Sequence, residues 1–487
     1  MTNHRSFPAQ HPTPDCADAW PAELDRNSPV PRDAGRRRLL KGLLGAGVGA
    51  AASPWLAPLA ALAQTAPPAG DYKALVCVFL FGGNDANNLL LPGDDARWAQ
   101  YRTARSNLAL QRDRVLPLNP PGTALAAPGA PYAIHPALPG VQKLYNAGRA
   151  AMLANVGPLI APVTKAQFQA GNVPLPRSLF SHADQQSAWQ AGVGDSADLR
   201  ARSGWGARLT ERLIAAGTAN RAYAALSLSG SNLWQIGDAG LTPYKLSSAG
   251  KFGFDFYDPA GGDPLSAAIA ATLAEPRSHL FEQAWLDVLG RSIEAQRVLA
   301  AALAGPSTLT TTFPNSGLGR QLAMTARLIG ARSALGLKRQ VFFTSLGGFD
   351  THGDQLGRQQ PLYNELDGAV AAFAAAMDEL GLGSQATLFT ASDFGRTLQS
   401  NGDGSDHGWG SHQLVVGGAV RGGQVLGQMP ELVVGGKDDT GSGRWIPSTS
   451  VTQLGASLGR WMGASLSQLA DVYPDLGNFG DLALMNA

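Results

Sequence analysis

Six apolar runs recur along the chain, and each predicts a β-strand. The first, KALVCVFLFGGND at residues 73–85, is uninterrupted and ends in two glycines, an asparagine and an aspartate. An uninterrupted run is typical of a strand covered on both faces, because both alternating sets of side chains must then be apolar. The other runs lie at residues 149–157, 222–230, 338–350, 385–395 and 412–420.

Two further segments carry a helical periodicity. In residues 359–383, which end near a stop at Gly381, apolar side chains recur at steps of three and four residues: Leu362, Leu366, Val370, Phe373 and Met377. Residues 450–463 follow the same pattern, with Thr449 or Ser450 as the N-cap. Strands that alternate with helices predict an α/β fold, here a doubly wound and mainly parallel sheet with helices on both faces.

The segment 231–335 gives no comparable alternation. A Gly/Ser/Pro-rich part at residues 231–265 is followed by a long helical pattern, SHLFEQAWLDVLGRSIEAQRVLAAAL. We interpret the segment as an insertion or cap packed on the sheet. Residues 64–487 are therefore expected to form one α/β domain that carries it.

The N-terminal region predicts a disordered leader and an export signal over residues 1–63. Residues 1–34 are polar and proline-rich, and residues 36–41, RRRLLK, fit the twin-arginine pattern. A Gly/Ala-rich apolar segment follows, and Ala61-Leu62-Ala63 offers a cleavage site before Gln64. We expect the twin-arginine translocase as the export partner, and a periplasmic or secreted mature protein.

The alternative for this region is a basic cluster in front of a membrane anchor. Pro54, Pro58 and the many glycines disfavour a spanning helix, and the apolar stretch is short. No stable membrane span is therefore expected in the mature chain.

The balance of charged residues and the cysteine content narrow the kinds of binding partner and of covalent cross-link that we expect. The chain carries 38 Lys and Arg against 37 Asp and Glu, which gives a formal net charge of +1. A nucleic acid or an anionic membrane surface would require a basic face, so neither is expected as the main partner. Cys77 would be the one cysteine of the mature chain, so no intramolecular disulfide is expected, and its apolar run predicts a buried thiol.

Three of the predicted strands end in an aspartate, namely Asp85, Asp350 and Asp393. Ligands of parallel α/β sheets bind beyond the carboxyl ends of the strands, so these side chains are expected to meet at one edge. Three carboxylates in one place repel one another unless a cation lies among them. Taken singly, Asp85 or Asp393 could instead cap a following helix.

Two glycine-rich loops at the same predicted edge hold three of the eight histidines. His352 lies in LGGFDTHGDQ (346–355), and His407 and His412 lie in ASDFGRTLQSNGDGSDHGWGSH (391–412). A mixed set of carboxylates and imidazoles suits Zn²⁺, Mn²⁺ or Fe, as one ion or two. The alternative for DGSDHG is an ordinary turn with a solvated histidine.

Seven motifs are distributed along nearly all of the expected mature chain: FLFGGNDANNLLLP, HPALPGVQKLYNAGRAAMLANVG, FSHADQQSAWQAG, GGFDTHGDQ, SDFGRT, DHGWGSH and RWIPSTSVTQLGASLGRWMG. Together with the leader they resemble an exported bacterial family of unknown function, number 1501 in the domain-of-unknown-function series. That family is grouped with the alkaline phosphatase–sulfatase superfamily, whose members hold a nucleophile and one or two metal ions at the C-terminal edge of a doubly wound sheet. The resemblance implies an alkaline phosphatase-like fold.

The resemblance also implies roles for single residues. Asp85 is similar to the superfamily's first metal-binding aspartate, and His412 to its late metal-binding histidine. Ser181 matches the nucleophile position at a helix start, with His182 beside it, although a plain helix N-cap is the other interpretation. Arg396 would bind an anionic oxyester group or pair with a nearby carboxylate.

Two departures from the superfamily pattern bear on the metal ions. Asp350 and His352 resemble an Asp/His metal-binding pair with a shorter spacing than usual. Asp393 matches the aspartate of a strand-end Asp-His pair, but Phe394 stands in the place of the histidine.

The presence of Phe394 leaves several outcomes open. The site would hold one metal ion, or a rearranged pair of ions with Asp406 or His407 as the substitute ligand, or the protein would be a pseudoenzyme that only binds. One or two divalent ions, among Zn, Mn, Fe, Mg and Ca, fit these expectations.

We therefore predict an exported, metal-dependent hydrolase of a phosphate, sulfate or related ester, with a small-molecule or polymer substrate. Metal would polarise the ester oxygen and activate Ser181 or a water. The alternative is a non-catalytic, metal-binding pseudoenzyme or envelope interaction protein of the same fold. The density of ionisable groups at one edge favours the first, and Phe394 favours the second.

Overall fold

The computed structural model describes residues 71–120, 131–194, 198–249, 257–258, 263–275, 277–305 and 309–486. The leader and export signal predicted over residues 1–63 lie outside this set and stay predictions.

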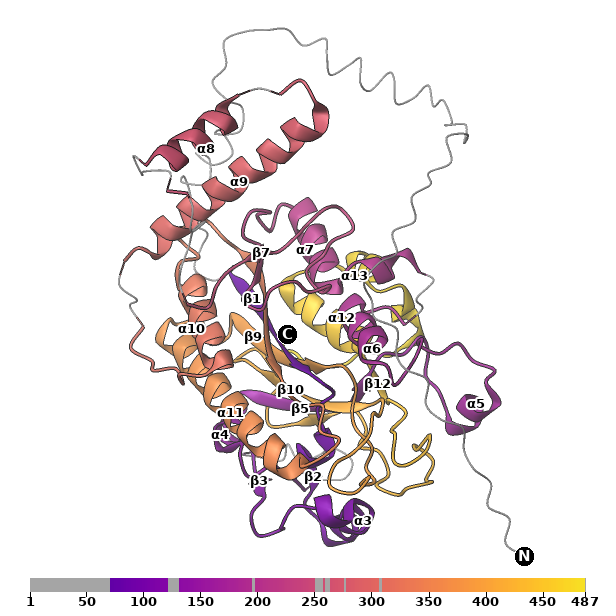
Figure 1. Ribbon diagram of the computed structural model, residues 1–487. Helices are drawn as coiled ribbons and strands as arrows, with labels where there is room; N and C mark the ends of the chain where they lie inside the picture. The colour runs from indigo at the N-terminus through magenta and orange to yellow at the C-terminus, as the bar shows by residue number, and fades with distance from the viewer. Residues whose placement is uncertain are drawn as a thin grey trace, which may run out of the picture. The chain divides into compact units, whose positions relative to one another are not determined.

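All six apolar runs form strands of one nine-stranded sheet (Figure 1). They are β1 (Lys73–Phe81), β5 (Ala150–Gly157), β6 (Ala225–Ser227), β8 (Arg339–Gly347), β9 (Ala386–Ser392) and β10 (Ser411–Val416). Three short strands extend the sheet: β7 (Tyr244–Lys245), β11 (Val425–Leu426) and β12 (Thr449–Ser450). The strand order is β11-β5-β10-β9-β1-β8-β6-β7, and β12 also pairs with β5.

The pairing directions place the predicted strand ends together. β1 is parallel to both β8 and β9, and Val76 lies opposite Phe342 on one side and Leu388 on the other. β10 runs antiparallel to β9 and β5, whereas the other described pairs in this sheet are parallel. The predicted mainly parallel sheet is confirmed, and the segments that follow β1, β8 and β9 leave it at one edge.

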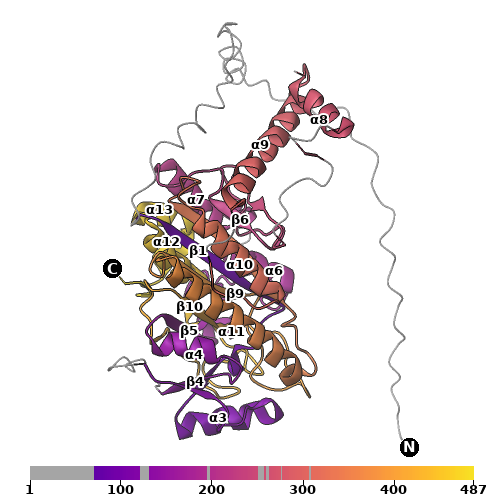
Figure 2. The same cartoon turned by 90° about the vertical axis from the view of Figure 1, so that its left-hand side faces the viewer.

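Helices cover both faces of the sheet, as Figures 1 and 2 show. One face packs against α4 (Pro139–Asn146), α10 (Gly317–Gly330) and α11 (Gln355–Glu379); the other packs against α6 (His182–Ala191), α7 (Trp205–Ala215), α12 (Val451–Met462) and α13 (Leu466–Val472). Val76 and Val78 of β1 enter the first core, and Leu75 and Cys77 enter the second. This double burial explains the uninterrupted apolar run. The thiol of Cys77 is buried as predicted, and burial raises its pKa.

The other described elements lie around this frame. A small antiparallel sheet contains β2 (Leu90–Pro92), β4 (Tyr132–Ile134) and β3 (Leu116–Leu118). The remaining helices are α3 (Asp95–Arg105), α5 (Lys165–Ala170), α8 (Pro264–Ala274) and α9 (Leu280–Leu303), and the 3₁₀-helices are η1 (Ala86–Asn88), η2 (Ser106–Leu108), η3 (Leu199–Arg202) and η4 (Pro474–Asn478). Among the helices of the described ranges, none has the length and apolar character to cross a membrane.

The two helices predicted from periodicity, α11 and α12, are confirmed. Ser450 caps α12 in a capping box with Gln453, and Gly463 ends it in a left-handed conformation. α11 begins at Gln355, about one turn earlier than predicted, and contains Pro361 in its interior.

The segment interpreted as an insertion or cap contains elements of two kinds. α10 belongs to the helical layer on the sheet, where Leu322 is buried in the same core as β1. In both views α8 and the N-terminal half of α9 extend away from the sheet, and Phe281 and Trp285 of α9 are exposed. The C-terminal end of α9 returns to the core through Leu299.

The turn after β1 requires two glycines. Gly82 has a φ of +112° and Gly83 a φ of +79°, a region that residues with a Cβ rarely adopt. A Cβ on Gly82 would lie 2.4 Å from the backbone nitrogen of Asp350, and one on Gly83 would lie 2.3 Å from the ring of Phe394. The chain therefore passes close to the ends of both strands that flank β1.

We expect Gly82→Ala to destabilise the fold more than Gly217→Ala. Both glycines have positive φ, so each alanine costs about 1–2 kcal/mol of backbone strain. At Gly217 nothing lies within 4 Å of the added Cβ, whereas at Gly82 the clash with Asp350 adds roughly 1–3 kcal/mol. Urea unfolding of the two variants measures the difference, and equal midpoints would contradict the close approach.

Candidate functional site

Three histidine side chains converge on the carboxylate of Asp350 at this edge of the sheet. The Nε2 atoms of His352 and His407 lie 3.2 and 3.4 Å from Asp350 Oδ1. The Nε2 atom of His182 lies 3.6 Å from Asp350 Oδ2. Within the described ranges, His182, Asp350 and His407 form the group whose ligand atoms all lie within 4.8 Å of one another and could hold a metal ion.

Each of these imidazoles is oriented through its other nitrogen. The Nδ1 atom faces an oxygen in every case: Asp393 Oδ2 for His182 (2.6 Å), Asp406 Oδ1 for His352 (3.2 Å) and the Phe180 carbonyl for His407 (2.8 Å). The Phe180 carbonyl can only accept, so the proton of a neutral His407 lies on Nδ1 and its lone pair lies on Nε2, on the side of Asp350. His182 and His352 each have a carboxylate facing both ring nitrogens, so their Nε2 atoms face Asp350 either as proton donors or, with the proton on Nδ1, as lone pairs open to a cation.

Two imidazole nitrogens meet at close range. His352 Nε2 and His407 Nε2 lie 2.9 Å apart. Burial lowers the pKa of His407, which favours its neutral form, so a lone pair on His407 Nε2 faces His352. Either a proton on His352 Nε2 or a metal cation would satisfy this lone pair.

The aromatic ring of Phe394 packs against two of the imidazoles. Its side chain is fully buried, and its ring centroid lies 4.8 Å from that of His182 and 4.6 Å from that of His407. The aromatic ring therefore supports two histidines by packing, at the position where the sequence resemblance led us to expect a histidine.

Asp350 is held as a charged carboxylate. Burial acts to raise its pKa, but the hydrogen bond and charge of Arg396, together with His352 and His182, outweigh burial, and the pKa is lowered. The Nη1 atom of Arg396 donates to Asp350 Oδ1 at 3.0 Å. An anionic carboxylate that faces three imidazole nitrogens completes a set of ligand atoms of the kinds that bind transition metals.

All three guanidinium nitrogens of Arg396 donate hydrogen bonds to other groups of the protein. Arg396 is 1% exposed, and it donates to the carbonyls of Ser405 and Gly82 as well as to Asp350. Of the two roles that the sequence allowed for Arg396, the structure shows the pairing with a carboxylate.

Asp393 contacts His182 through Nδ1, the ring nitrogen that does not face Asp350. Its Oδ2 atom contacts His182 Nδ1 and accepts hydrogen bonds from the backbone of Gly82 (3.2 Å) and from Gln186 Nε2 (2.9 Å). The side chain is fully buried, and Oδ1 has no partner among the described residues.

Ser181 lies at the start of α6, next to His182. It is the N-cap of that helix, and its hydroxyl oxygen accepts a long hydrogen bond, 3.5 Å, from the backbone of Asp184. The helix start that the sequence predicted is present, and so is the capping contact that was the other interpretation.

Asp85 and His412 have other partners, although both lie at the predicted edge. Asp85 contacts Arg105, Gln355 and Asn87, not the three histidines, because the chain turns into η1 directly after it. His412 is buried in β10, where its Nδ1 atom accepts a hydrogen bond from the backbone of Asn155 at 3.0 Å. The expectation of one cluster that also contains Asp85 and His412 is corrected on this point.

Two arginines at the site were not singled out from the sequence. Arg444 donates from Nε to the His407 carbonyl at 2.8 Å, and its guanidinium lies 5.1 Å from the ring centroid of Phe180. Arg358, an exposed residue of α11, donates to the carbonyl of Asp350 at 3.2 Å. Arg358 lies outside the seven motifs, and Arg444 is the first residue of RWIPSTSVTQLGASLGRWMG, where nothing in the spacing marks it as a site residue.

The fold and the site define a mainly parallel α/β protein with an Asp/His cluster at the C-terminal edge of its sheet. Residues 72–466, most of the chain, match the family model described as "Protein of unknown function (DUF1501)". The chain belongs to this family. No curated protein matches its sequence.

The chain is also similar to several solved structures. A sulfatase from Pseudoalteromonas sp. is 12% identical over 86% of this chain and 74% of that one, with a TM-score of 0.34. The lipoteichoic acid synthase LtaP from Listeria monocytogenes is 9% identical over 83% and 76%, with a TM-score of 0.33. A mutant of the alkaline phosphatase PafA is 15% identical over 68% and 64%, with a TM-score of 0.24. The activity of this chain is therefore argued from its own site.

We expect His412→Asn to reduce the loss of stability in acid. Burial lowers the pKa of His412 to about 4, below the unfolded value of about 6.5, so its contribution is present above pH 6.5 and is lost as the pH falls toward 4. Asparagine keeps an acceptor for the Asn155 N–H and does not titrate. The free energy of unfolding of wild type should therefore fall by about 3 kcal/mol more than that of the variant across this range.

Urea unfolding at pH 7 and pH 4.5 measures this difference. His279→Asn, at an exposed helix N-cap, leaves His412 in place and is the control. Parallel losses in wild type and His412→Asn would contradict the assignment of a neutral, buried His412.

Proposed function

We propose that the protein is a metal-dependent hydrolase of a phosphate, sulfate or related anionic ester. The ion is held by the Nε2 atoms of His182, His352 and His407 together with the carboxylate of Asp350. The observation that carries this proposal is the meeting of three imidazole Nε2 atoms at one carboxylate, while each Nδ1 atom faces another oxygen.

Four of the distances among these atoms are close to those expected around a single small ion. Ligand bonds of about 2.0–2.1 Å in a tetrahedral site separate neighbouring ligand atoms by roughly 3.3 Å. The four contacts measure 2.9, 3.2, 3.4 and 3.6 Å. His352 lies outside the group whose ligand atoms are all within 4.8 Å of one another, so its side chain would have to move to complete the set.

The donor set narrows the identity of the ion. Three imidazoles and one carboxylate suit Zn²⁺, Mn²⁺ or Fe²⁺, whereas Mg²⁺ and Ca²⁺ prefer sites built from oxygen. The Nδ1 atom of each of these histidines contacts an oxygen of Asp393, Asp406 or Phe180. Metal-binding histidines in proteins have outer partners of this kind.

The residues around the ion would supply the remaining functions. When bound, such an ion supplies a Lewis acid for an ester oxygen. Arg444 and Arg358 have N–H groups without a hydrogen bond to another described residue, so they are available to an anionic group of the substrate. The Ser181 hydroxyl, beside His182 at the start of α6, is the proposed nucleophile, and a water is the other candidate.

The proposal includes export from the cytoplasm by the twin-arginine translocase. It rests on residues 36–41 and on the Ala61-Leu62-Ala63 site, which lie outside the described residues. A binding-only protein of the same fold is the second candidate, and it is favoured by Phe394 at a position where the superfamily pattern has a ligand.

The purified protein is expected to contain about one divalent transition-metal ion per chain by elemental analysis. His352→Ala combined with His407→Ala removes two of the four ligands and should abolish retention of the ion, whereas the control His279→Ala should keep it. Asp393→Asn should weaken the affinity by roughly 10- to 100-fold, because His182 loses the charge that orients it. Metal content unchanged in the double variant would refute the ligand assignment.

Ser181→Ala is expected to separate chemistry from metal binding. The variant should keep the ion and lose hydrolysis of a confirmed phosphate or sulfate ester by a factor on the order of 10³. Ser187→Ala on the same helix is the control, since its exposed hydroxyl contacts only the Ala183 carbonyl. A wild-type rate for Ser181→Ala would leave water as the nucleophile, and failure of metal-loaded wild type to cleave any ester of a broad panel would favour the binding-only protein.

A further inference from the structure

We infer that Asp85 is a positioning residue, which sets the orientation of the metal ligand Asp350 through Gln355, Ser405 and Arg396. The inference rests on the proposed function, because it assigns Asp350 to the ion. It gives Asp85 a role in the same site without a contact to the ion.

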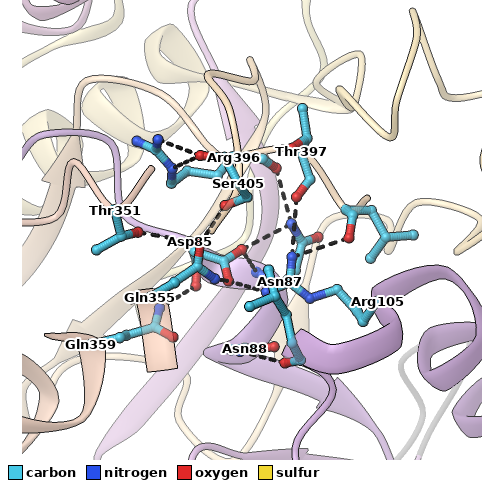
Figure 3. Close-up of polar contacts among 12 residues, drawn as sticks. Asp85, Asn87, Asn88, Arg105, Thr351, Gln355, Gln359, Arg396, Thr397 and Ser405 are labelled. Carbon is cyan, nitrogen blue, oxygen red and sulfur yellow. Dashed lines mark hydrogen bonds and ion pairs between the residues drawn. The ribbon is translucent and has the colours of Figure 1, made fainter. Parts of the chain in front are cut away.

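Both carboxylate oxygens of Asp85 are taken up by donors (Figure 3). Oδ2 forms a fully buried ion pair with Arg105 Nη2 and accepts a hydrogen bond from Gln355 Nε2 at 2.5 Å. Oδ1 accepts from the backbone nitrogen and the side-chain amide of Asn87, at 3.3 and 3.1 Å. Asp85 is 1% exposed, whereas the side chain of Asp350 is 45% exposed. Asp350 is therefore the carboxylate that is accessible to an ion.

A chain of side-chain contacts leads from Asp85 to the metal ligand. Because Gln355 Nε2 donates to Asp85, the other end of the amide, Oε1, must act as the acceptor, and it receives the Ser405 hydroxyl. The Ser405 carbonyl accepts from Nε and Nη2 of Arg396, which fixes the plane of the guanidinium. Nη1 of the same group then donates to Asp350 Oδ1 at 3.0 Å. Figure 3 shows the contacts from Asp85 as far as Arg396.

A second set of contacts holds the backbone of Arg396. Asn87 Nδ2 donates both to Asp85 Oδ1 and to the Arg396 carbonyl at 3.0 Å. Arg105 Nη1, on the far side of the ion pair, donates to the carbonyls of Thr397 and Leu398 at 3.1 Å each. Asp85 thus fixes the partners that hold Arg396 by its main chain and by its guanidinium.

The charges of these side chains also link Asp85 to Arg396. Arg396 is buried, and burial lowers its pKa, while the negative charges of Asp350 and Asp85 act in the opposite sense. Two guanidinium groups and two carboxylates lie along these contacts. Arg105, Asp85 and Arg396 are buried, where little water screens a charge, and Asp350 is the exposed end of the series. Loss of the contacts from Asp85 should therefore loosen Arg396, and with it Asp350.

The test uses Gln355→Met, since Asp85→Asn would leave Arg105 buried without its counter-charge and put folding at risk. Methionine has nearly the length of glutamine, keeps the Asp85–Arg105 pair and removes the link to Ser405. Asn88→Ala is the matched control: Asn88 is a buried amide of η1 that contacts Leu108 and Tyr101 but not the Arg396 loop.

Co²⁺ serves as the probe in the full-length, exported protein. We expect Gln355→Met to weaken Co²⁺ affinity about tenfold and to change the Co²⁺ absorption spectrum, as loss of an outer partner of a ligand does. Ser405→Ala should have a similar effect, and the two changes together should cost no more than one alone. Asn88→Ala should lower the melting temperature without changing either signal. Wild-type affinity and spectrum in Gln355→Met, or an equal change in the control, would overturn the inference.

A second measurement separates this inference from the proposed function. In metal-free protein with isotope-labelled histidine, Gln355→Met should shift the imidazole signals of His352 and His407 and leave those of His135 and His412 in place. Unshifted signals would overturn the role of Asp85. Absence of Co²⁺ binding by wild type would overturn the metal-dependent function, and the imidazole signals would still decide whether Asp85 positions the site.

Discussion

The parallel pairing of β1 with β8 on one side and β9 on the other is the constraint on which the site depends. It makes three strands end at one edge, so the loops that follow them must share the same space. The two glycines after β1 let the chain leave the sheet without filling that space, because a Cβ on either one would collide with the neighbouring strand ends. Asp350 and Asp393 then lie on either side of this turn, and the imidazole of His182 lies between their carboxylates.

The three imidazoles are oriented by three separate parts of the chain. A strand-end aspartate, a loop aspartate and a main-chain carbonyl each face one Nδ1 atom. Phe394 packs against two of the imidazoles at the position where the sequence resemblance led us to expect a histidine, and the edge still holds its ionisable groups. The cluster and its partners are therefore one unit, in which each imidazole has a second contact that determines its direction.

The sequence was sufficient for the sheet, its mainly parallel character and the helices α11 and α12, because apolar periodicity and caps are local signals. It also indicated the edge at which Asp350, Asp393 and the loop histidines meet. It could not give the direction of a side chain after a turn. Asp85 points into a buried network because η1 follows it, and His412 is held within β10 by a contact to Asn155, a residue far away in the chain. Arg358 lies outside the quoted motifs, and Arg444 begins one of them without a spacing that indicates a site, since the place of both arginines at the site arises only from tertiary packing.

The exposure of the site has a further consequence for the kind of molecule that it can serve. The side chains of Asp350 and His352 are 45% and 47% exposed. A shallow centre touches little of a substrate beyond the reacting group, so there is little remote binding energy to draw on, and selectivity must come from the few groups at the rim. The same openness lets the reacting group be carried on a large body that stays in solvent. Under the proposed ester hydrolysis, a terminal or pendant ester of a polymer would then reach the centre as readily as a free small molecule.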